Sequence, residues 1–186
     1  MRKINLYIFS RRPEISVGKT RLKKRVGKII GSNFYLNNLL NTIRIFYNDK
    51  RINLKICVNP DKAVTEWPIY IFPKIKRIPQ GKGDLGVKMW NIINFDNKAK
   101  IIIGGDIQDI KKPYIIDAWK KLKNRDIVFG PSEDGGFWLI GISKVRKLNF
   151  IFQGVDWSLE NTLAQVIFQL PKYISVDFTK TLTDVD

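Results

Sequence analysis

Two carboxylates in this sequence follow an apolar strand-like run and a pair of glycines, a position suited to binding a cation and phosphates. Asp106 closes the run Ile-Ile-Ile-Gly-Gly-Asp at residues 101–106, and Asp109 follows it closely. In open α/β sheets, ligands bind outside the carboxyl ends of the strands, which is where Asp106 would lie. Because Mg²⁺ and Mn²⁺ bind through one or two carboxylates plus substrate phosphates, we predict that Asp106 and Asp109 hold Mg²⁺ or Mn²⁺. The alternative is that one of them caps the helix that follows.

A second acidic turn, Asp134-Gly135-Gly136, separates two apolar runs at residues 126–130 and 137–142. The runs are rich in β-branched and aromatic residues, which is typical of strands. Glycines allow the backbone to approach a ligand closely, so the turn is a candidate binding site. The alternative is an ordinary hairpin connection in which Asp134 only caps the turn.

A basic loop follows the first predicted strand and opens a helix. Its cations include Arg11, Lys19 and Arg21, and cations beside a helix N-terminus make an anion site. The string Gly-Lys-Thr at residues 18–20 suggests a P-loop, but that motif requires a glycine five positions before Gly18. Pro13 stands there, which excludes the P-loop.

A glycine-rich loop at residues 80–86 reads Gln80-Gly81-Lys-Gly83-Asp84-Leu-Gly and leads into a predicted helix. Such a loop can lay backbone groups against a ligand, although on its own it would indicate only a turn.

These four segments, taken in order, resemble a bacterial glycosyltransferase-like family related to the 2-phospholactate and molybdenum-cofactor guanylyltransferases. The likeness covers nearly the whole chain and rests on separated motifs: K-x-P-x-P-G-x-V-K-T-R-L at residues 11–22, Q-G-x-G-D-L-G at 80–86, G-x-D-x-P around Asp106, G-P-x-x-D-G-G-Y/F-x-L-x-G at 130–141, W-S at 157–158 and a closing D-x-D at 184–186. The chain departs from this pattern at residues 15–16, which are Ile-Ser rather than Pro-Gly, and at 107–108, which are Ile-Gln.

The resemblance implies metal-dependent transfer from a nucleotide-activated donor, most simply glycosyl transfer from a nucleotide sugar to a small-molecule acceptor that the sequence does not identify. It implies four sets of site residues: Arg11, Lys19 and Arg21 on phosphate; Gln80, Gly81, Gly83 and Asp84 on the nucleotide; Asp106, with Asp109, on the metal; and Asp134 with Gly135, Gly136 and Trp157 facing the acceptor. The catalytic carboxylates would be Asp106, through the metal, and Asp134, as a hydrogen-bond acceptor or general base. The alternative for Trp157 is a buried aromatic residue of the core. A nucleotidyltransferase, guanylyltransferase-like and acting on a small phosphorylated or acidic acceptor, would use the same scaffold.

The formal net charge of +16 favours a different class, a nucleic-acid-binding or regulatory module without turnover. The basic runs, however, are spread over several elements, and no RNP-like or helix-turn-helix pattern organises them. We therefore do not expect nucleic acid as the partner. The chain has no histidine, which removes Ser-His-Asp chemistry and most zinc sites, and its one cysteine, Cys57, lies in an apolar run.

The order of apolar runs predicts one α/β domain over residues 1–186. Predicted strands at residues 4–10, 54–58, 69–72, 101–105, 127–130, 137–142 and 173–178 alternate with predicted helices at 19–30, 34–47, 85–95, 112–123 and 159–170. This alternation is typical of a three-layer αβα sandwich with a mostly parallel sheet, and the family resemblance makes it glycosyltransferase-A-like. We expect no membrane span and no signal peptide, and hence a cytoplasmic protein.

Overall fold

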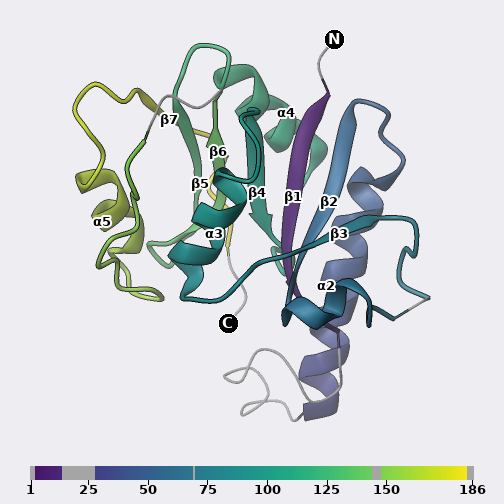
Figure 1. Cartoon of the computed structure of the whole chain (residues 1–186). Coiled ribbons are helices and arrows are strands. Elements are labelled where there is room, and N and C mark those ends of the chain that lie inside the picture. The colour runs from purple at the N-terminus through teal and green to yellow at the C-terminus, as the bar shows by residue number, and fades with distance from the viewer. Residues whose placement is uncertain (1–2, 14–27, 69, 144–147, 184–186) are drawn as a thin grey trace.

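Seven strands form one sheet in the order β3-β2-β1-β4-β6-β5-β7 in the computed structural model (Figure 1). The structure describes residues 3–13, 28–68, 70–143 and 148–183. Strand β6 runs antiparallel to β4 and β5, whereas the pairs β1·β2, β1·β4, β2·β3 and β5·β7 are parallel. The prediction of a mostly parallel sheet is confirmed. The strands are β1 (Ile4–Arg11), β2 (Ile52–Asn59), β3 (Lys76–Pro79), β4 (Lys100–Gly104), β5 (Ile127–Pro131), β6 (Phe137–Ile142) and β7 (Val176–Phe178).

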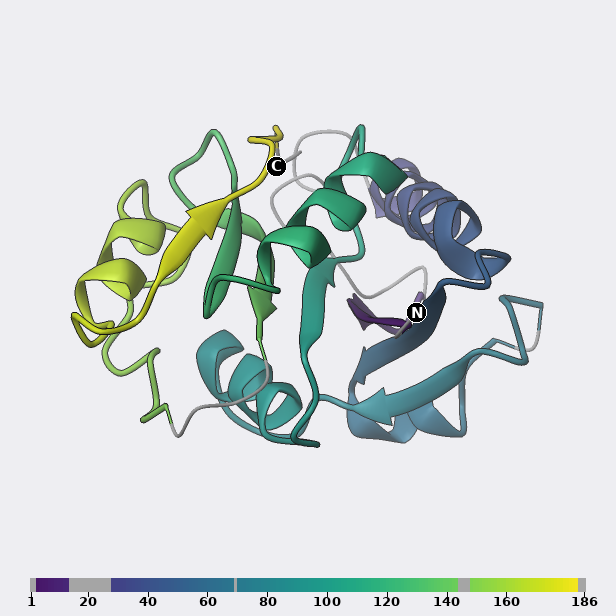
Figure 2. The ribbon, with the colours of Figure 1, turned by 90° about the horizontal axis from the view of Figure 1, so that it is seen from above.

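Helices cover both faces of this sheet (Figure 2). Helices α2 (Lys28–Tyr47) and α4 (Lys112–Lys121) pack on one face, while α3 (Leu85–Ile93) and α5 (Thr162–Phe168) pack on the other. Successive side chains of a strand point to opposite faces, so Leu6 and Ile8 of β1 join the first core and Tyr7 joins the second. The three-layer arrangement is therefore the one that the sequence predicts.

The predicted strand at residues 69–72 is wrong. Residues 70–72 form a turn in which Phe72 has a φ of 41°, and the strand of this region is β3, farther along the chain. Ile71 is buried, and its carbonyl accepts a hydrogen bond of 2.9 Å from the indole of Trp67. Its apolar side chain thus fills the core beside the short 3-10 helix η1 (Asp61–Val64) without pairing in the sheet.

The helices differ from their predicted bounds. Residues 28–30, expected to end one helix, instead begin α2, which continues through the buried Gly31 and Ser32 to Tyr47. Residues 19–27 of the expected first helix lie outside the described residues. Helix α5 and strand β7 are shorter than predicted.

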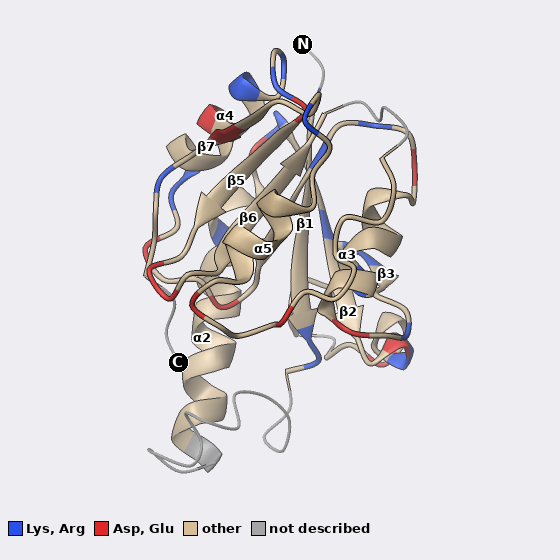
Figure 3. Ribbon diagram, turned by 90° about the vertical axis from the view of Figure 1, so that its left-hand side faces the viewer, with Lys and Arg blue, Asp and Glu red and all other residues tan. Residues whose placement is uncertain are grey.

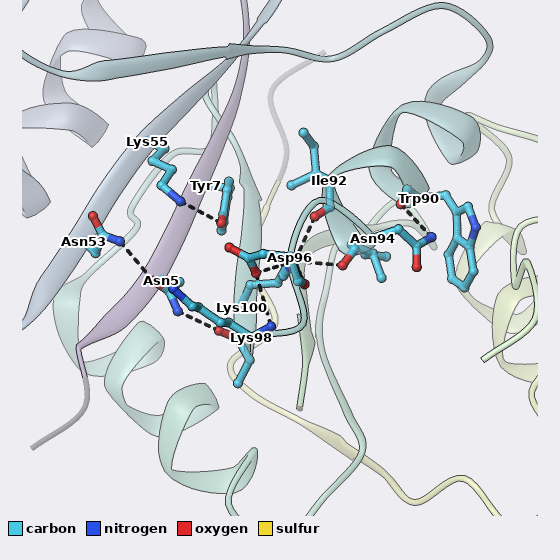
Figure 4. Close-up of polar contacts among 12 residues, drawn as sticks. Asn5, Tyr7, Asn53, Lys55, Trp90, Ile92, Asn94, Asp96, Lys98 and Lys100 are labelled. Atoms are coloured by element: carbon cyan, nitrogen blue, oxygen red, sulfur yellow. Dashed lines mark hydrogen bonds and ion pairs between the residues drawn. The ribbon is translucent and has the colours of Figure 1, made fainter. Parts of the chain in front are cut away.

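A buried lysine at the start of β4, Lys100, hydrogen-bonds to the carboxyl end of α3 (Figure 4). The Nζ of Lys100 donates to the carbonyls of Ile92 at 3.0 Å, Ile93 at 2.7 Å and Asp96 at 2.7 Å. It also lies 3.1 Å from a carboxylate oxygen of Asp96. Burial lowers the pKa of Lys100, and Asp96 opposes that change. One side chain thus supplies the donors that the last carbonyls of α3 lack.

Candidate active site

Four parts of the chain that carry predicted site residues meet at the carboxyl edge of the sheet (Figure 3). Strands β1, β2 and β4 are parallel to one another, and β5 runs in their direction because each of β4 and β5 is antiparallel to β6. The end of β1 at Arg11, the loop after β3, the loop after β4 and the turn between β5 and β6 therefore lie at one edge. This is the edge at which ligands bind in open α/β sheets.

A buried tyrosine fixes the end of β1 at this edge. The hydroxyl of Tyr35 lies 2.8 Å from Oγ of Ser10, accepts from the backbone amide of Arg11 at 2.8 Å and donates to its carbonyl at 3.1 Å. Burial raises the pKa of Tyr35 to about 12, and the nearby negative charge of Asp106 acts in the same direction. Phe9 of β1 pairs with Gly104, the last residue of β4, so Asp106 lies close to the end of β1, where the basic loop begins.

The side chain of Arg11 is exposed at this point, while the neighbouring Arg12 pairs with Glu66 at 2.6 Å. Arg11 is thus the predicted phosphate-binding cation that the structure places at the carboxyl edge. The other two, Lys19 and Arg21, lie outside the described residues, as do Asp184 and Asp186.

Asp106 is partly exposed just beyond β4, and its carboxylate folds back toward the strand. A Cβ placed on Gly104 would lie 3.3 Å from Oδ1 of Asp106, so the glycine at the strand end leaves room for this carboxylate. Asp109 is exposed and has a φ of 54°. The residue before α4 is Lys111, and no side chain caps that helix. The alternative assignment of these aspartates as helix caps is therefore wrong.

Polar side chains of the loop after β3 hydrogen-bond to the backbone of neighbouring elements. The buried amide of Gln80 donates to the carbonyls of Cys57 at 2.8 Å and Ser10 at 3.3 Å, which ties together the ends of β1 and β2. Asp84 caps α3 by accepting from the amide of Val87 at 2.8 Å. The nucleotide contacts predicted for Gln80 and Asp84 therefore stay predictions, and the observed roles of these two side chains are structural.

The two glycines of this loop both have a positive φ, 81° at Gly81 and 110° at Gly83. The amide of Gly81 donates to Oδ1 of Asp61 at 3.0 Å, and a Cβ at Gly81 would lie 2.7 Å from Nδ2 of Asn91. Asp61 and Asn91 are supporting residues that the motifs did not reveal, because they lie outside every recognisable pattern.

Asp134 lies in a tight turn whose geometry is set by its glycines. The amide of Gly136 donates to Oδ1 of Asp134 at 3.0 Å, and the amide of Ser132 donates to the carbonyl of Gly136 at 3.0 Å. Gly135 has a φ of 84°, and its carbonyl accepts from the amide of Leu163 at 3.0 Å. The segment is a hairpin connection, as the simpler interpretation predicts, and it also holds the exposed Asp134 carboxylate in place.

A pocket of about 190 Å³ lies beside Asp134. Leu85 and Met89 of α3 form part of its wall, with Ile102 and Gly104 of β4 and Phe137 of β6. Gly136 and Trp157 also line the pocket, whereas Asp106 does not. The structure therefore brings the predicted acceptor-side residues Asp134, Gly136 and Trp157 together around one cavity, with the predicted metal aspartate outside its wall.

Trp157 packs against residues of two other sequence motifs. Its ring packs against Phe152 at 5.8 Å and Phe137 at 6.4 Å between centroids. A Cβ on Gly86 would lie 2.8 Å from Cζ2 of Trp157, so the last glycine of the loop after β3 accommodates the indole. Its Nε1 is buried and has no hydrogen-bond partner among the residues that the structure describes.

Comparison with known proteins places the chain in a family. Residues 42–159 match the family described as "Uncharacterized protein conserved in bacteria (DUF2064)". The chain belongs to this family. The match includes the loop after β3, Asp106, Asp134 and Trp157. No curated protein matches the chain.

Solved structures share the fold of this family member. A "putative nucleotide-diphospho-sugar transferase" from Desulfovibrio desulfuricans G20 matches with a TM-score of 0.84 and 23% identity, over 100% of this chain and 83% of that one. The 4-diphosphocytidyl-2C-methyl-D-erythritol synthase from Anaerococcus prevotii DSM 20548 matches with a TM-score of 0.57 and 10% identity, over 99% and 90% of the two chains. At these identities the likeness shows the fold, which is that of nucleotide-diphospho-sugar transferases.

Within the part of the chain that the structure describes, none of the helices combines the length and the hydropathy of a membrane-spanning segment. Cys57 is buried in β2, and burial raises the pKa of its thiol, so the described surroundings give no support to a nucleophilic role.

Proposed function

We propose that this protein is a metal-dependent transferase that takes a group from a nucleotide-activated donor, with a nucleotide sugar as the donor and glycosyl transfer as the reaction. The observation that carries the proposal is the gathering of Arg11, Asp106, the loop after β3 and Asp134 at the carboxyl edge of one sheet. The nucleotide-diphospho-sugar transferase fold supports it.

The donor would lie across the ends of β1 and β4. The exposed guanidinium of Arg11 would pair with diphosphate oxygens, and the positive-φ glycines Gly81 and Gly83 would let the loop backbone approach the nucleoside. Asp134 would accept the proton of the acceptor hydroxyl as that oxygen attacks the transferred carbon.

The residues present fit a divalent cation of the Mg²⁺ or Mn²⁺ type. Such ions need one or two protein carboxylates and complete their shell with substrate phosphates and water. Asp106, just beyond β4 and close to the end of β1, meets that need. No group of three or more acidic or cysteine side chains suited to a cation is found among the described residues. When bound, the ion would stabilise the negative charge that develops on the leaving diphosphate. Asp109 would contribute only as a second carboxylate.

The proposal is tested by a thermal-shift screen of nucleotides and nucleotide sugars with Mg²⁺, with Mn²⁺ and with EDTA. A ligand at about 100 times its dissociation constant stabilises a protein by roughly 2.7 kcal/mol. We expect at least one nucleoside-diphosphate ligand to raise the melting temperature only when a divalent cation is present. Equal shifts in EDTA would contradict the metal assignment.

Asp106→Asn isolates the metal carboxylate in the same screen. The amide keeps the shape but loses the charge, so the cation-dependent shift should disappear. Glu133→Gln is the matched control, because Glu133 is an exposed carboxylate at the same edge whose Oε2 accepts from Thr183. It should retain the full shift.

Nucleotidyl transfer is the second candidate, and the product distinguishes it. Glycosyl transfer releases a nucleoside diphosphate, whereas transfer of a nucleotide from a triphosphate releases pyrophosphate. A nucleic-acid-binding module would instead show RNA or DNA affinity that falls steeply with salt and no dependence on the cation.

A further inference from the structure

We propose that the pocket beside Asp134 receives an acceptor with a ring-sized apolar part, a free hydroxyl and no negative charge. The inference deepens the proposed function, since it names the chemical class of the acceptor in glycosyl transfer. It also makes a phosphorylated or acidic acceptor, as in the nucleotidyl alternative, a poor fit to this pocket.

The charge of the pocket wall differs sharply from the charge of the chain. The sequence holds 33 lysines and arginines against 17 aspartates and glutamates, yet no lysine or arginine is among the described residues that line the pocket. Among these described lining residues, Asp134 is the only charged one. An anionic acceptor would bring a second negative charge next to this carboxylate with no cation in the described wall to offset it.

The wall is suited to an apolar ring. Phe9, Met89, Ile102 and Phe137 contribute apolar surface, and the volume of about 190 Å³ exceeds the roughly 150 Å³ of an apolar cavity that is known to hold benzene. Two lining leucines are unusually exposed, Leu85 at 45% and Leu159 at 50%. Covering such side chains with an apolar ligand removes apolar surface from water, which favours binding.

Polar groups at the same wall can orient a hydroxyl. Oδ1 of Asp134 accepts from Gly136, and no described residue bonds its Oδ2. Ser132 and Ser158, which carry hydroxyl groups, are also among the residues that line the pocket. A few polar groups placed in an otherwise apolar pocket fix the orientation of a small molecule.

The transfer step balances with this acceptor. The acceptor oxygen forms a bond to the transferred sugar carbon, and the bond from that carbon to the diphosphate oxygen breaks. The electron pair leaves with the nucleoside diphosphate, while the hydroxyl proton passes to Asp134. A neutral or cationic hydroxyl compound meets every requirement.

The test compares three probes that share a phenol ring and differ in charge: tyrosol, which is neutral, tyramine, which is cationic, and 4-hydroxyphenylacetate, which is anionic. Binding to the full chain is measured by ligand-observed NMR titration, without donor and without a divalent cation. We expect tyrosol and tyramine to bind at least about tenfold more tightly than 4-hydroxyphenylacetate, a difference of about 1.4 kcal/mol.

Leu159→Lys places a cation at the pocket and should narrow or reverse this preference for probes without negative charge. Phe168→Lys is the matched control, since Phe168 is 91% exposed in α5 and is not among the lining residues, and it should leave the ranking unchanged. Equal or tighter binding of the anion to the wild type, no response to Leu159→Lys, or no binding of any probe at millimolar concentration would each overturn the proposal. Because neither donor nor cation is present, failure of the proposed function would leave this result interpretable.

Discussion

The backbone amide of Gly136 donates a hydrogen bond of 3.0 Å to Oδ1 of Asp134, and this bond holds the carboxylate in the turn that borders the pocket. An asparagine side chain can accept the same bond through its carbonyl oxygen. The charge and basicity of Asp134 can therefore be removed while the shape of the turn is kept.

Asp134→Asn should accordingly lower donor turnover by about 10²–10⁴-fold, the loss typical of an absent general base. The cation-dependent thermal shift with the donor nucleotide should remain close to that of the wild type, because Asp134 is assigned to the acceptor side. Turnover and shift are measured on the same preparation. Glu133→Gln again serves as the control. Normal turnover by Asp134→Asn would mean that the turn serves only as a hairpin connection.

Gly135→Ala should destabilise the protein by about 3 kcal/mol or more. The position has a φ of 84°, and an added Cβ would lie only 1.7 Å from the backbone carbonyl oxygen of Glu160. Gly154→Ala provides the matched comparison, since its φ is 63° but nothing lies within 4 Å of an added Cβ. It should cost about 1 kcal/mol, from backbone strain alone. Urea unfolding measures both, and equal costs would show that close packing against Glu160 is not important.

Tyr35→Phe should change the stability of the protein in alkali. The pKa of Tyr35 rises from its usual 10.0 to about 12 on folding because the hydroxyl is buried, so the neutral form is favoured in the folded state. That contribution is fully present below pH 10 and is lost as the pH rises through about 12.

Between those values the wild type should lose about 1.4 kcal/mol per pH unit more than Tyr35→Phe does, measured from urea midpoints across the range. Below pH 10 the variant should be less stable by about 1–2 kcal/mol, because the hydrogen bonds to Ser10 and Arg11 are missing. Tyr70→Phe, at a position that is 76% exposed, should follow the wild type. Parallel alkaline profiles for Tyr35→Phe and wild type would contradict this account.

Lys100→Met should destabilise the protein by about 2–4 kcal/mol, since it leaves Asp96 without its cation and three carbonyls without their donor. Lys98→Met changes an exposed lysine two residues away and should stay within about 0.5 kcal/mol of the wild type. Chemical unfolding of the two variants tests the difference directly. If Lys100→Met has the same free energy of unfolding as the wild type, water replaces the lost donor.

The sequence predicted the sheet well where apolar runs were both long and buried. Residues 101–103 are isoleucines with both faces covered, and such a run has few alternatives to a central strand. The predicted strand around Ile71 was wrong, because Ile71 packs into the core beside Trp67 and does not pair in the sheet. Tertiary packing overrode local preference there.

The motifs predicted which segments lie together at the carboxyl edge of the sheet, but not what their side chains contact. Gln80 and Asp84 resembled ligand contacts because they lie in a glycine-rich loop, yet their side chains bind the backbone of Cys57 and Val87. Only the spatial closeness of β1, β2 and α3 reveals this. The Asp84 cap had a visible signal, an aspartate at a helix start, whereas Tyr35 had none, since it looks like any aromatic on the buried side of a helix.

Product release from the nucleotide sugar that binds best in the thermal-shift screen tests the proposed transferase activity most directly. Wild type, Asp106→Asn and Asp134→Asn are incubated with the donor and with the phenolic acceptor that binds most tightly, in Mg²⁺ and in EDTA, and nucleoside diphosphate is quantified. We expect the wild type to release nucleoside diphosphate only when both Mg²⁺ and the acceptor are present. Asp106→Asn should lose both donor binding and release, whereas Asp134→Asn should lose release and keep donor binding. Release that is unchanged in EDTA, or equal in all three proteins, would contradict the proposed activity, as would the absence of release by the wild type from every donor that binds.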